Sequence, residues 1–367
     1  MTRIISILLT TLLSTLLTVA RANEPATEGE SEGIDTKAIV FDHLGDAYGW
    51  EVPFNHHKRI PLPIIVKTDD GFHCFSSARV EHGAEWVDGG VTFKIAGEDS
   101  EYKGKVVAIV DGKEVKPLDI SITKNVLALF ISVGLVVGLM LWLAGFYRRH
   151  GVGKTPRKGL GAVEAVLTFI YDGVIKSTLG KDAPRFAPYL LTVFFFIFGM
   201  NLLGLIVIFP GGANLTGNIA VTMVLALCTF LVTNIFGTKH YWKDIFWPDV
   251  PIWLKCPLPI MQVIEVFGIF TKPAALTVRL FANMLGGHML VIVLTLLIFI
   301  FAAMSPVFGV ASIAVSIPFS IFMLLIDCLV SFIQAYVFTM LSTIFISLAQ
   351  EHGHHEEVNE TIALETK

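Results

Sequence analysis

Charged residues are scarce in this chain: they make up 16% of its 367 residues, whereas 54% are hydrophobic. Soluble globular proteins carry about 25% charged residues, so the composition predicts a polytopic membrane protein with some soluble material attached. The four cysteines show no zinc-binding spacing, and no disulfide is expected because Cys74 alone lies in the soluble part. The net charge of −4 gives no indication of nucleic-acid binding, and the sequence has no phosphate-binding loop.

Residues 1–22 have the pattern of a signal peptide. Arg3 supplies the positive start, an apolar stretch runs from Ile4 to Val19, and Ala20-Arg21-Ala22 is a cleavage site of the A-x-A type. An uncleaved first membrane helix is the alternative. In both cases the residues that follow are expected outside the cytoplasm.

Residues 23–123 are expected to form a β-rich extracytoplasmic domain behind an acidic linker. Alternating runs at 60–66 and 91–95 are typical of strands, and Asp70-Gly71 and Asp111-Gly112 are typical of hairpin turns. Four histidines in this region have no spacing that distinguishes them from ordinary surface histidines: His56, His57, His73 and His82.

Three apolar segments are long enough to cross about 30 Å of hydrocarbon; they cover residues 126–146, 186–209 and 219–236. The loop after the first is rich in Arg and Lys, and the loop at 210–218 has neither. Because basic loops face the cytoplasm, this pattern agrees with an external N-terminal domain.

Residues 160–178 have a different periodicity. Glu164, Thr168, Asp172 and Lys176 recur every four positions on one side, and the opposite side is apolar. This pattern predicts an amphipathic helix that lies on the membrane rather than crossing it.

Two further apolar segments are too long for upright spans. Residues 273–304 would form a helix of about 48 Å and residues 319–348 one of about 45 Å, against a hydrocarbon core of about 30 Å. Overlong helices tilt, so we expect a steeply inclined hairpin. Two short spans with Arg279 in the turn between them are discounted, because residues 257–271 are too few and contain Glu265. The expected fold is therefore an all-α polytopic membrane domain with five transmembrane helices and one interfacial helix.

Polar residues pair across this hairpin. In an antiparallel pair of helices, the residue numbers of any two facing positions add up to nearly the same total. That total is 613 for Arg279 with Gln334 and 615 for His288 with Asp327. The corresponding turn falls beside Ser305-Pro306. Arg279 and His288 lie on opposite sides of a straight helix. We therefore expect Arg279 and Gln334 to face one partner, and His288 and Asp327 to line a separate water-filled cavity.

These residues have distinct chemistry. Arg279 stays charged at any accessible pH, and a charge at the bilayer centre costs at least about 2.5–3.5 kcal/mol, so a functional role is the default interpretation; the alternative is an arginine that snorkels to the headgroups. His288 and Asp327 together indicate a proton relay, with a helix-packing hydrogen bond as the alternative. Three supporting residues are expected to orient the arginine or permit close packing: Asn283, Gly286 and Gly287.

Three motifs resemble the signatures of subunit a of F-type ATP synthases. They are Leu280 to Met284 after Arg279 with Gly287-His288 following, Gln334 to Phe338, and Asn201 to Leu205. The resemblance covers about residues 121–351. It implies a non-catalytic proton-conducting stator subunit beside a rotating ring of small carboxylate-bearing subunits, with no cofactor and no metal.

The resemblance also assigns roles. It implies that Arg279 faces the ring between two aqueous half-channels, with Gln334 near it. It implies that His288 and Asp327 form the polar pair of the uptake half-channel, in an order swapped relative to some members. Glu265 matches the acidic position near the cytoplasmic exit.

A multi-pass protein of the bacterial inner membrane follows from the same resemblance. Residues 124–350 would be the membrane domain and residues 351–367 a cytoplasmic, solvated tail. The implied partners are the ring, the subunit b stator stalk, the remaining ATP synthase subunits and membrane lipid. Residues 23–123 and 241–251 depart from the family pattern, which assigns the longer segment no role.

Two other functions stay open from the sequence. One is an independent secondary transporter with Arg279 binding an anion, although that class usually shows internal repeats and none is visible here. The other is a membrane-anchored binding protein that acts through residues 23–123.

Overall fold

The computed structural model describes the chain in twelve stretches: residues 46–52, 55–68, 71–80, 84–97, 100, 102–110, 113–151, 153–156, 159–206, 215–246, 260–304 and 306–365. The expected signal peptide, the acidic linker, His82 and the Asp111-Gly112 turn lie outside these residues.

The N-terminal region is β-rich, as predicted. β1 (Gly49–Val52) pairs with β2 (Asn55–Pro61), and β3 (Pro63–Thr68) lies between β4 (Gly71–Ser76) and β9 (Leu118–Asp119). The remaining sheet has the order β5-β6-β7-β8, which are Trp86–Asp88, Val91–Ile95, Val106–Val110 and Lys113–Val115. All of these pairings are antiparallel, and one core lies between the sheets, with Ile64, Val66, Phe75, Phe93 and Val106 among its members.

Alternation and turn chemistry explain the strands. In β3, Ile64 and Val66 are buried and Lys67 is exposed, as the two-residue repeat of a strand requires. Gly71 opens β4 at a φ of 140°, in agreement with the predicted hairpin turn. The prediction missed a second turn, Gly89-Gly90, whose φ values of 59° and 87° suit a two-residue hairpin loop between β5 and β6.

His73 is not the ordinary surface histidine that the sequence suggested. Its ring is buried, with Nδ1 3.1 Å from Asp88 Oδ2 and Nε2 3.0 Å from Thr68 Oγ1. It therefore ties the β3–β4 hairpin to the end of β5. The spacing of His73, Asp88 and Thr68 along the chain could not predict this contact, because the three residues meet only through the packing of two sheets.

Five long helices follow: α3 (Lys124–His150), α6 (Ala183–Leu205), α7 (Ile219–Ile235), α10 (Ile260–Met304) and α11 (Pro306–Glu365). Among the described residues, the stretches 124–150, 159–205, 262–294 and 312–350 are long and apolar enough to cross a membrane, and α7 is shorter. These helices agree with a multi-pass membrane protein. A short helix, α8 (Lys239–Phe246), follows α7.

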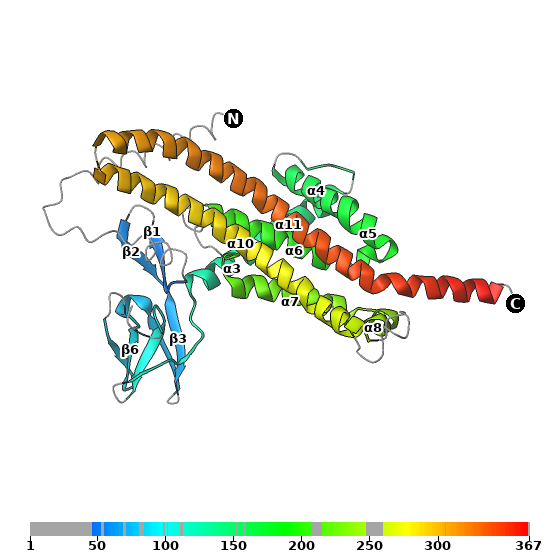
Figure 1. Cartoon of the computed structure of the whole chain (residues 1–367), viewed down its shortest axis with the longest axis horizontal. Coiled ribbons are helices and arrows are strands. Elements are labelled where there is room, and N and C mark those ends of the chain that lie inside the picture. Colours follow the sequence, from blue (N-terminus) through cyan, green and yellow to red (C-terminus); the bar gives the residue numbers. More distant parts are fainter. Residues whose placement is uncertain are drawn as a thin grey trace.

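The predicted amphipathic segment is helical. It comprises α4 (Gly159–Ile170), a wider π-helical turn at 171–176 and α5 (Ser177–Leu179). Its apolar side is packed inside the protein, with Ile170 and Ile175 fully buried, and Figure 1 shows α4 and α5 flanking α6 and α11.

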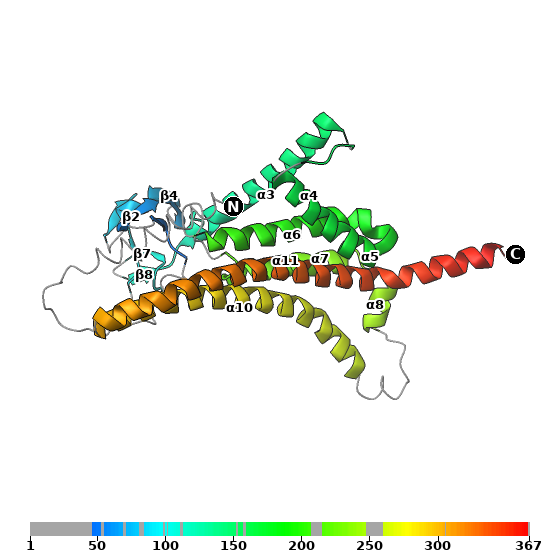
Figure 2. The same cartoon turned by 90° about the horizontal axis from the view of Figure 1, so that it is seen from above.

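The last two helices form the expected hairpin, in which α10 and α11 lie side by side (Figures 1 and 2). α10 ends at Met304 and α11 begins at Pro306. The turn therefore lies where the residue numbers of the polar pairs predicted it. The predicted bounds 273–304 and 319–348 were too short, because Pro273 and Pro318 lie inside the helices. Proline is tolerated within membrane helices when neighbouring groups satisfy the freed backbone, so it was a poor boundary marker here.

Two further features depart from the expected outline. α10 is visibly curved in Figure 2, with Pro273 and the Gly286-Gly287 pair along its length. α11 continues through residues 351–365, so most of the expected tail is helical.

Tyr48 links the sheets of the N-terminal region. Its hydroxyl donates a hydrogen bond to Asp119 Oδ2 and accepts one from the Val106 N–H at 3.3 Å. Burial, and then the Asp119 carboxylate, raise the pKa of Tyr48 far above its usual value. The stability that Tyr48 contributes is therefore present below about pH 10 and is lost as the pH rises beyond it toward the folded-state pKa.

Replacing Tyr48 by Phe is expected to lower the free energy of local opening by about 1–3 kcal/mol, because it leaves buried polar groups without a partner. Hydrogen–deuterium exchange on the full chain in detergent should show faster exchange at Val106. Tyr102→Phe is the matched control, since the Tyr102 hydroxyl makes no hydrogen bond within the described residues. Equal exchange in both variants would contradict the assignment.

Candidate functional site

One close contact fixes the register of the α10–α11 hairpin. A Cβ added at Gly287 would lie 2.9 Å from Asp327 Oδ1 and 3.2 Å from its Cγ. The residue numbers 287 and 327 add up to 614, which lies between the totals of 613 and 615 for the two polar pairs predicted from the sequence. This register places Arg279 level with Gln334, and it explains why position 287 requires a glycine.

His288 and Asp327 lie at one small cavity between α10, α11 and the end of α6. Its volume is about 10 Å³, at the lower limit for one water molecule. The lining residues are Leu205, Asn283, Met284, Gly287, His288, Asp327, Val330 and Ser331. No hydrogen bond joins the His288 and Asp327 side chains within the described part of the chain. The two side chains therefore line the same cavity without a direct hydrogen bond between them.

Arg279 lies on the opposite side of α10, where its side chain is exposed. Ala275 and Ala282 are exposed about one turn away on either side, Asn283 is exposed beside Ala282, and Gly286 is exposed about two turns away. Within the described residues, no hydrogen bond or ion pair holds the guanidinium. Small residues allow close approach of another helix, so this face can receive a partner that neutralises the charge.

Gln334 and Asn283, which the sequence also predicted as site residues, do not lie where Arg279 lies. Gln334 is level with Arg279 but buried at 7% exposure, so it does not share the exposed face that the pattern predicted. Asn283 combines the two locations, being exposed and also adjoining the cavity of His288. It can therefore contact both the arginine's face and the polar pair.

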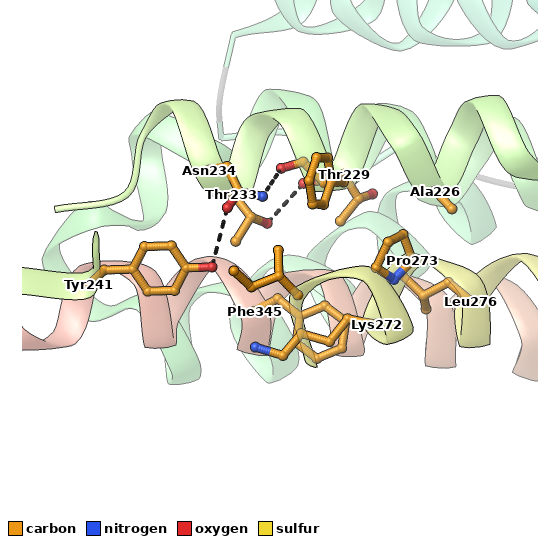
Figure 3. Close-up of a pocket in the computed structure, with 11 residues that line it drawn as sticks. Ala226, Thr229, Thr233, Asn234, Tyr241, Lys272, Pro273, Leu276 and Phe345 are labelled. Atoms are coloured by element: carbon orange, nitrogen blue, oxygen red, sulfur yellow. Dashed lines mark hydrogen bonds between the residues drawn. The ribbon is translucent and has the colours of Figure 1, made fainter. Parts of the chain in front are cut away.

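A second cavity, lined by both polar and apolar residues, lies nearer the start of α10, on the side of Glu265. Figure 3 shows this cavity, of about 20 Å³, between α7, α8, α10 and α11. The Tyr241 hydroxyl donates to Asn234 Oδ1 at 3.4 Å, and Asn234 Nδ2 donates to the Phe230 carbonyl at 2.7 Å. Lys272 reaches in from α10, with its Nζ 5.4 Å from the ring centre of Phe345.

Glu265 belongs to the surroundings of this cavity. Burial raises the pKa of Tyr241, and the Glu265 carboxylate raises it further, which places the two groups within electrostatic range. Sequence reasoning missed Asn234, Tyr241 and Lys272. The available signals were a polar end on α7 and a lysine before Pro273, but neither revealed that the residues meet.

Arg279 lies between these two cavities along α10. It is fourteen positions from Glu265, about 21 Å on a helix, and nine positions from His288, about 14 Å. The fixed charge thus lies between two cavities at different levels of α10.

The Asn201 motif supports the first cavity. Thr216 Oγ1 donates to Asn201 Oδ1 at 2.7 Å, and both residues are buried. This bond ties the last turns of α6, which carry Leu205 to the cavity, to the segment before α7. Among the described residues, no group of three His, Cys, Asp or Glu side chains could hold a metal ion.

Comparisons with known proteins follow this division of the chain. Residues 126–347 match the family model described as ATP synthase A chain, and residues 39–123 match a domain of unknown function (DUF8433). ATP synthase subunit a of Myxococcus xanthus (strain DK1622) is 40% identical over 266 residues, which covers 70% of this chain and 81% of that protein. ATP synthase subunit a of Pelodictyon phaeoclathratiforme (strain DSM 5477 / BU-1) is 40% identical over 246 residues, covering 65% and 68%.

Gly287→Ala is expected to destabilise the protein by about 1–3 kcal/mol, because the new methyl group must displace the Asp327 carboxylate. Thermal unfolding in detergent measures the change. Gly286→Ala is the matched control: nothing lies within 4 Å of its added Cβ, and alanine is favoured over glycine in a helix by up to about 1 kcal/mol. An equal loss of stability in the two variants, or a larger loss in Gly286→Ala, would contradict the register.

Proposed function

The chain belongs to the ATP synthase subunit a family, the non-catalytic proton-translocating stator subunit of the complex, and from this premise we propose how its residues conduct protons. A proton reaches His288 and Asp327 from the extracytoplasmic side. It passes to a carboxylate on a rotating ring of small subunits, and the neutral carboxyl can then face lipid. After rotation the carboxyl releases its proton toward Glu265 at the cytoplasmic side.

The observation that carries this proposal is Arg279, which is exposed beside Ala275 and Ala282, has no hydrogen bond or ion pair among the described residues, and lies between two cavities along α10. A guanidinium cannot give up its proton, so it cannot relay. It attracts a carboxylate and keeps that carboxylate ionised, and it repels protons that would cross directly from one cavity to the other. A rotor carboxylate is the partner that this face requires.

The two cavities suit the two half-channels. Histidine is the side chain whose ordinary pKa lies nearest neutral pH, and the cavity that His288 shares with Asp327 leaves a place for water. At the other end, Tyr241, Asn234 and Lys272 supply polar groups near Glu265. Each proton that crosses 100 mV supplies about 2.3 kcal/mol, so several are needed for each ATP.

The topology belongs to the same proposal. Five spans, with α4 and α5 at the interface, leave residues 23–123 in the periplasm and the end of α11 in the cytoplasm. The basic residues at the end of α3 agree with this orientation. The subunit b stator stalk and the remaining ATP synthase subunits complete the proposed assembly in the bacterial inner membrane.

Arg279→Ala is expected to reduce coupled ATP synthesis to background, because no fixed charge then separates the two half-channels. ATP synthesis and ATP-driven proton pumping in membrane vesicles measure this loss. Arg149→Ala removes an exposed arginine near the cytoplasmic end of α3 and serves as the control for net charge. Normal pumping by the Arg279 variant would overturn the proposed role.

Cysteine cross-linking tests which face meets the ring. Cysteines at Ala282 and Asn283, which are exposed beside Arg279, are expected to form adducts with a small carboxylate-bearing protein in native membranes. A cysteine at Leu276 should not, because that side chain is 2% exposed. If Leu276 cross-links and the exposed positions do not, the assigned face is wrong.

A further inference from the structure

One face of the β4-β3-β9 sheet is apolar and open. Residues directly opposite each other in antiparallel strands lie on the same face, and the register places Lys67 between Phe72 and Leu118. Alternation along β3 puts this row on the face opposite to the buried Ile64 and Val66. Phe72 is 69% exposed and Leu118 is 62% exposed. The face that is turned away from the core, which we call the outer face, therefore presents large apolar side chains at the surface.

A second row of the outer face lies nearer to the first membrane helix. Ile65 is paired with the exposed Cys74, and the Ile120 N–H donates to the Ile65 carbonyl at 2.9 Å. Ile120 is 55% exposed. The Ile122 N–H donates to the Pro63 carbonyl at 3.2 Å, so the strand pairing continues to within two residues of the start of α3.

The first membrane helix continues this open apolar surface. One side of α3 carries exposed apolar residues at helical spacing, namely Val126, Phe130, Val133, Val137 and Leu141. The other side is buried and includes Val136, whose Cγ2 would lie 3.3 Å from a Cβ added at Gly199 of α6. Because α3 is long and apolar enough to cross a membrane, its exposed stripe is a lipid-facing surface. The stripe begins four residues after Ile122, at the end of the outer face.

Hydrogen bonds and packing hold the sheet and α3 in one arrangement. The Asn125 N–H donates to Asp46 Oδ1 at 3.2 Å, and Thr123 caps the helix by accepting from the Val126 N–H at 3.4 Å. Trp50 of β1 is 3% exposed and belongs to the buried cluster of the membrane helices. The outer face therefore keeps a fixed position relative to the end of the helix.

The outer face also lies on the side of the β-rich region that is nearer the membrane. Figure 1 shows β3 close to the membrane helices and β6 farther from them. The core of the region lies between the sheets that contain these two strands, so the outer face is turned away from β6.

We propose that the outer face of the β4-β3-β9 sheet rests on the membrane leaflet at the start of α3 and contacts lipid. Phe72, Leu118 and Ile120 enter the boundary between headgroups and acyl chains, where apolar side chains leave water. The inference goes beyond the proposed function and requires only that α3 crosses the membrane. It gives residues 39–123, which match a domain of unknown function, a role as a membrane-surface domain.

The composition of the outer face suits lipid. Lys67 is the single charged residue among its paired positions, and its Nζ lies 5.5 Å from the ring centre of Phe72. A lysine at a membrane surface lays its stem along apolar groups and directs its ammonium to the headgroup phosphates. The lipid around α3 already reaches the end of the outer face, whereas another subunit would have to replace that lipid in order to cover it.

Spin labelling of Cys74 tests the contact in vesicles that contain the complete membrane sector. Cys228, Cys256 and Cys328 are replaced by Ser, and a chain without cysteine gives the background from other subunits. Power saturation then compares collisions of the label with oxygen, which concentrates in lipid, and with a water-soluble neutral nickel chelate. Val87→Cys in a chain that lacks Cys74 is the matched control, because Val87 is 59% exposed on β5 of the opposite sheet.

We expect the ratio of oxygen collisions to nickel-chelate collisions to be several-fold higher at Cys74 than at Val87→Cys. Phe72→Glu should lower the ratio at Cys74 toward that of the control, because a carboxylate is unfavourable in the apolar part of the interface. Val110→Glu places the same charge at a 47% exposed position of β7 and should leave the ratio unchanged. ATP-driven proton pumping in each variant shows that the labelled chain is assembled.

Two results would overturn the inference. Equal ratios at Cys74 and Val87→Cys would place the outer face in water. A label at Cys74 that is protected from both oxygen and the nickel chelate would show that a protein, either another subunit or a second copy of this chain, covers the face in place of lipid.

Discussion

The arrangement of the membrane domain depends on one unpaired charge. Arg279 is exposed on an apolar hairpin and has no partner among the described residues. Its insertion is unfavourable by at least about 2.5–3.5 kcal/mol, and nothing within the described chain compensates for it. Under the proposed function, a carboxylate from another molecule that comes to this face would compensate for the charge, and the small residues beside Arg279 would allow its approach.

The hairpin keeps that charge apart from His288 and Asp327. The contact between Gly287 and the Asp327 carboxylate sets the register, and the half-turn between Arg279 and His288 sends the two side chains in different directions. A single helix can thus present a fixed cation to a partner and a titratable group to water. Small shifts of α10 against α11 would disturb both functions together.

Much of this could be predicted from the sequence. The length of the apolar segments predicts the hairpin. The residue numbers of the polar pairs then predict where its turn lies and which residues face each other across it. The start of α10 did not follow, because the helix continues through Pro273 with its neighbours' support. The buried place of Gln334, the second cavity around Tyr241, and the burial of His73 each depend on contacts between elements distant in the sequence, which no periodicity records.

The start of α3 depends on residues that lie far away in the sequence. The bond between the Asn125 N–H and Asp46 Oδ1 spans 79 positions, whereas Thr123 caps the same turn locally. One amide of the first turn therefore has its partner only when the residues before β1 return to the start of α3. A substitution that displaces those residues would loosen the first turn of α3, far from the altered residue in the sequence.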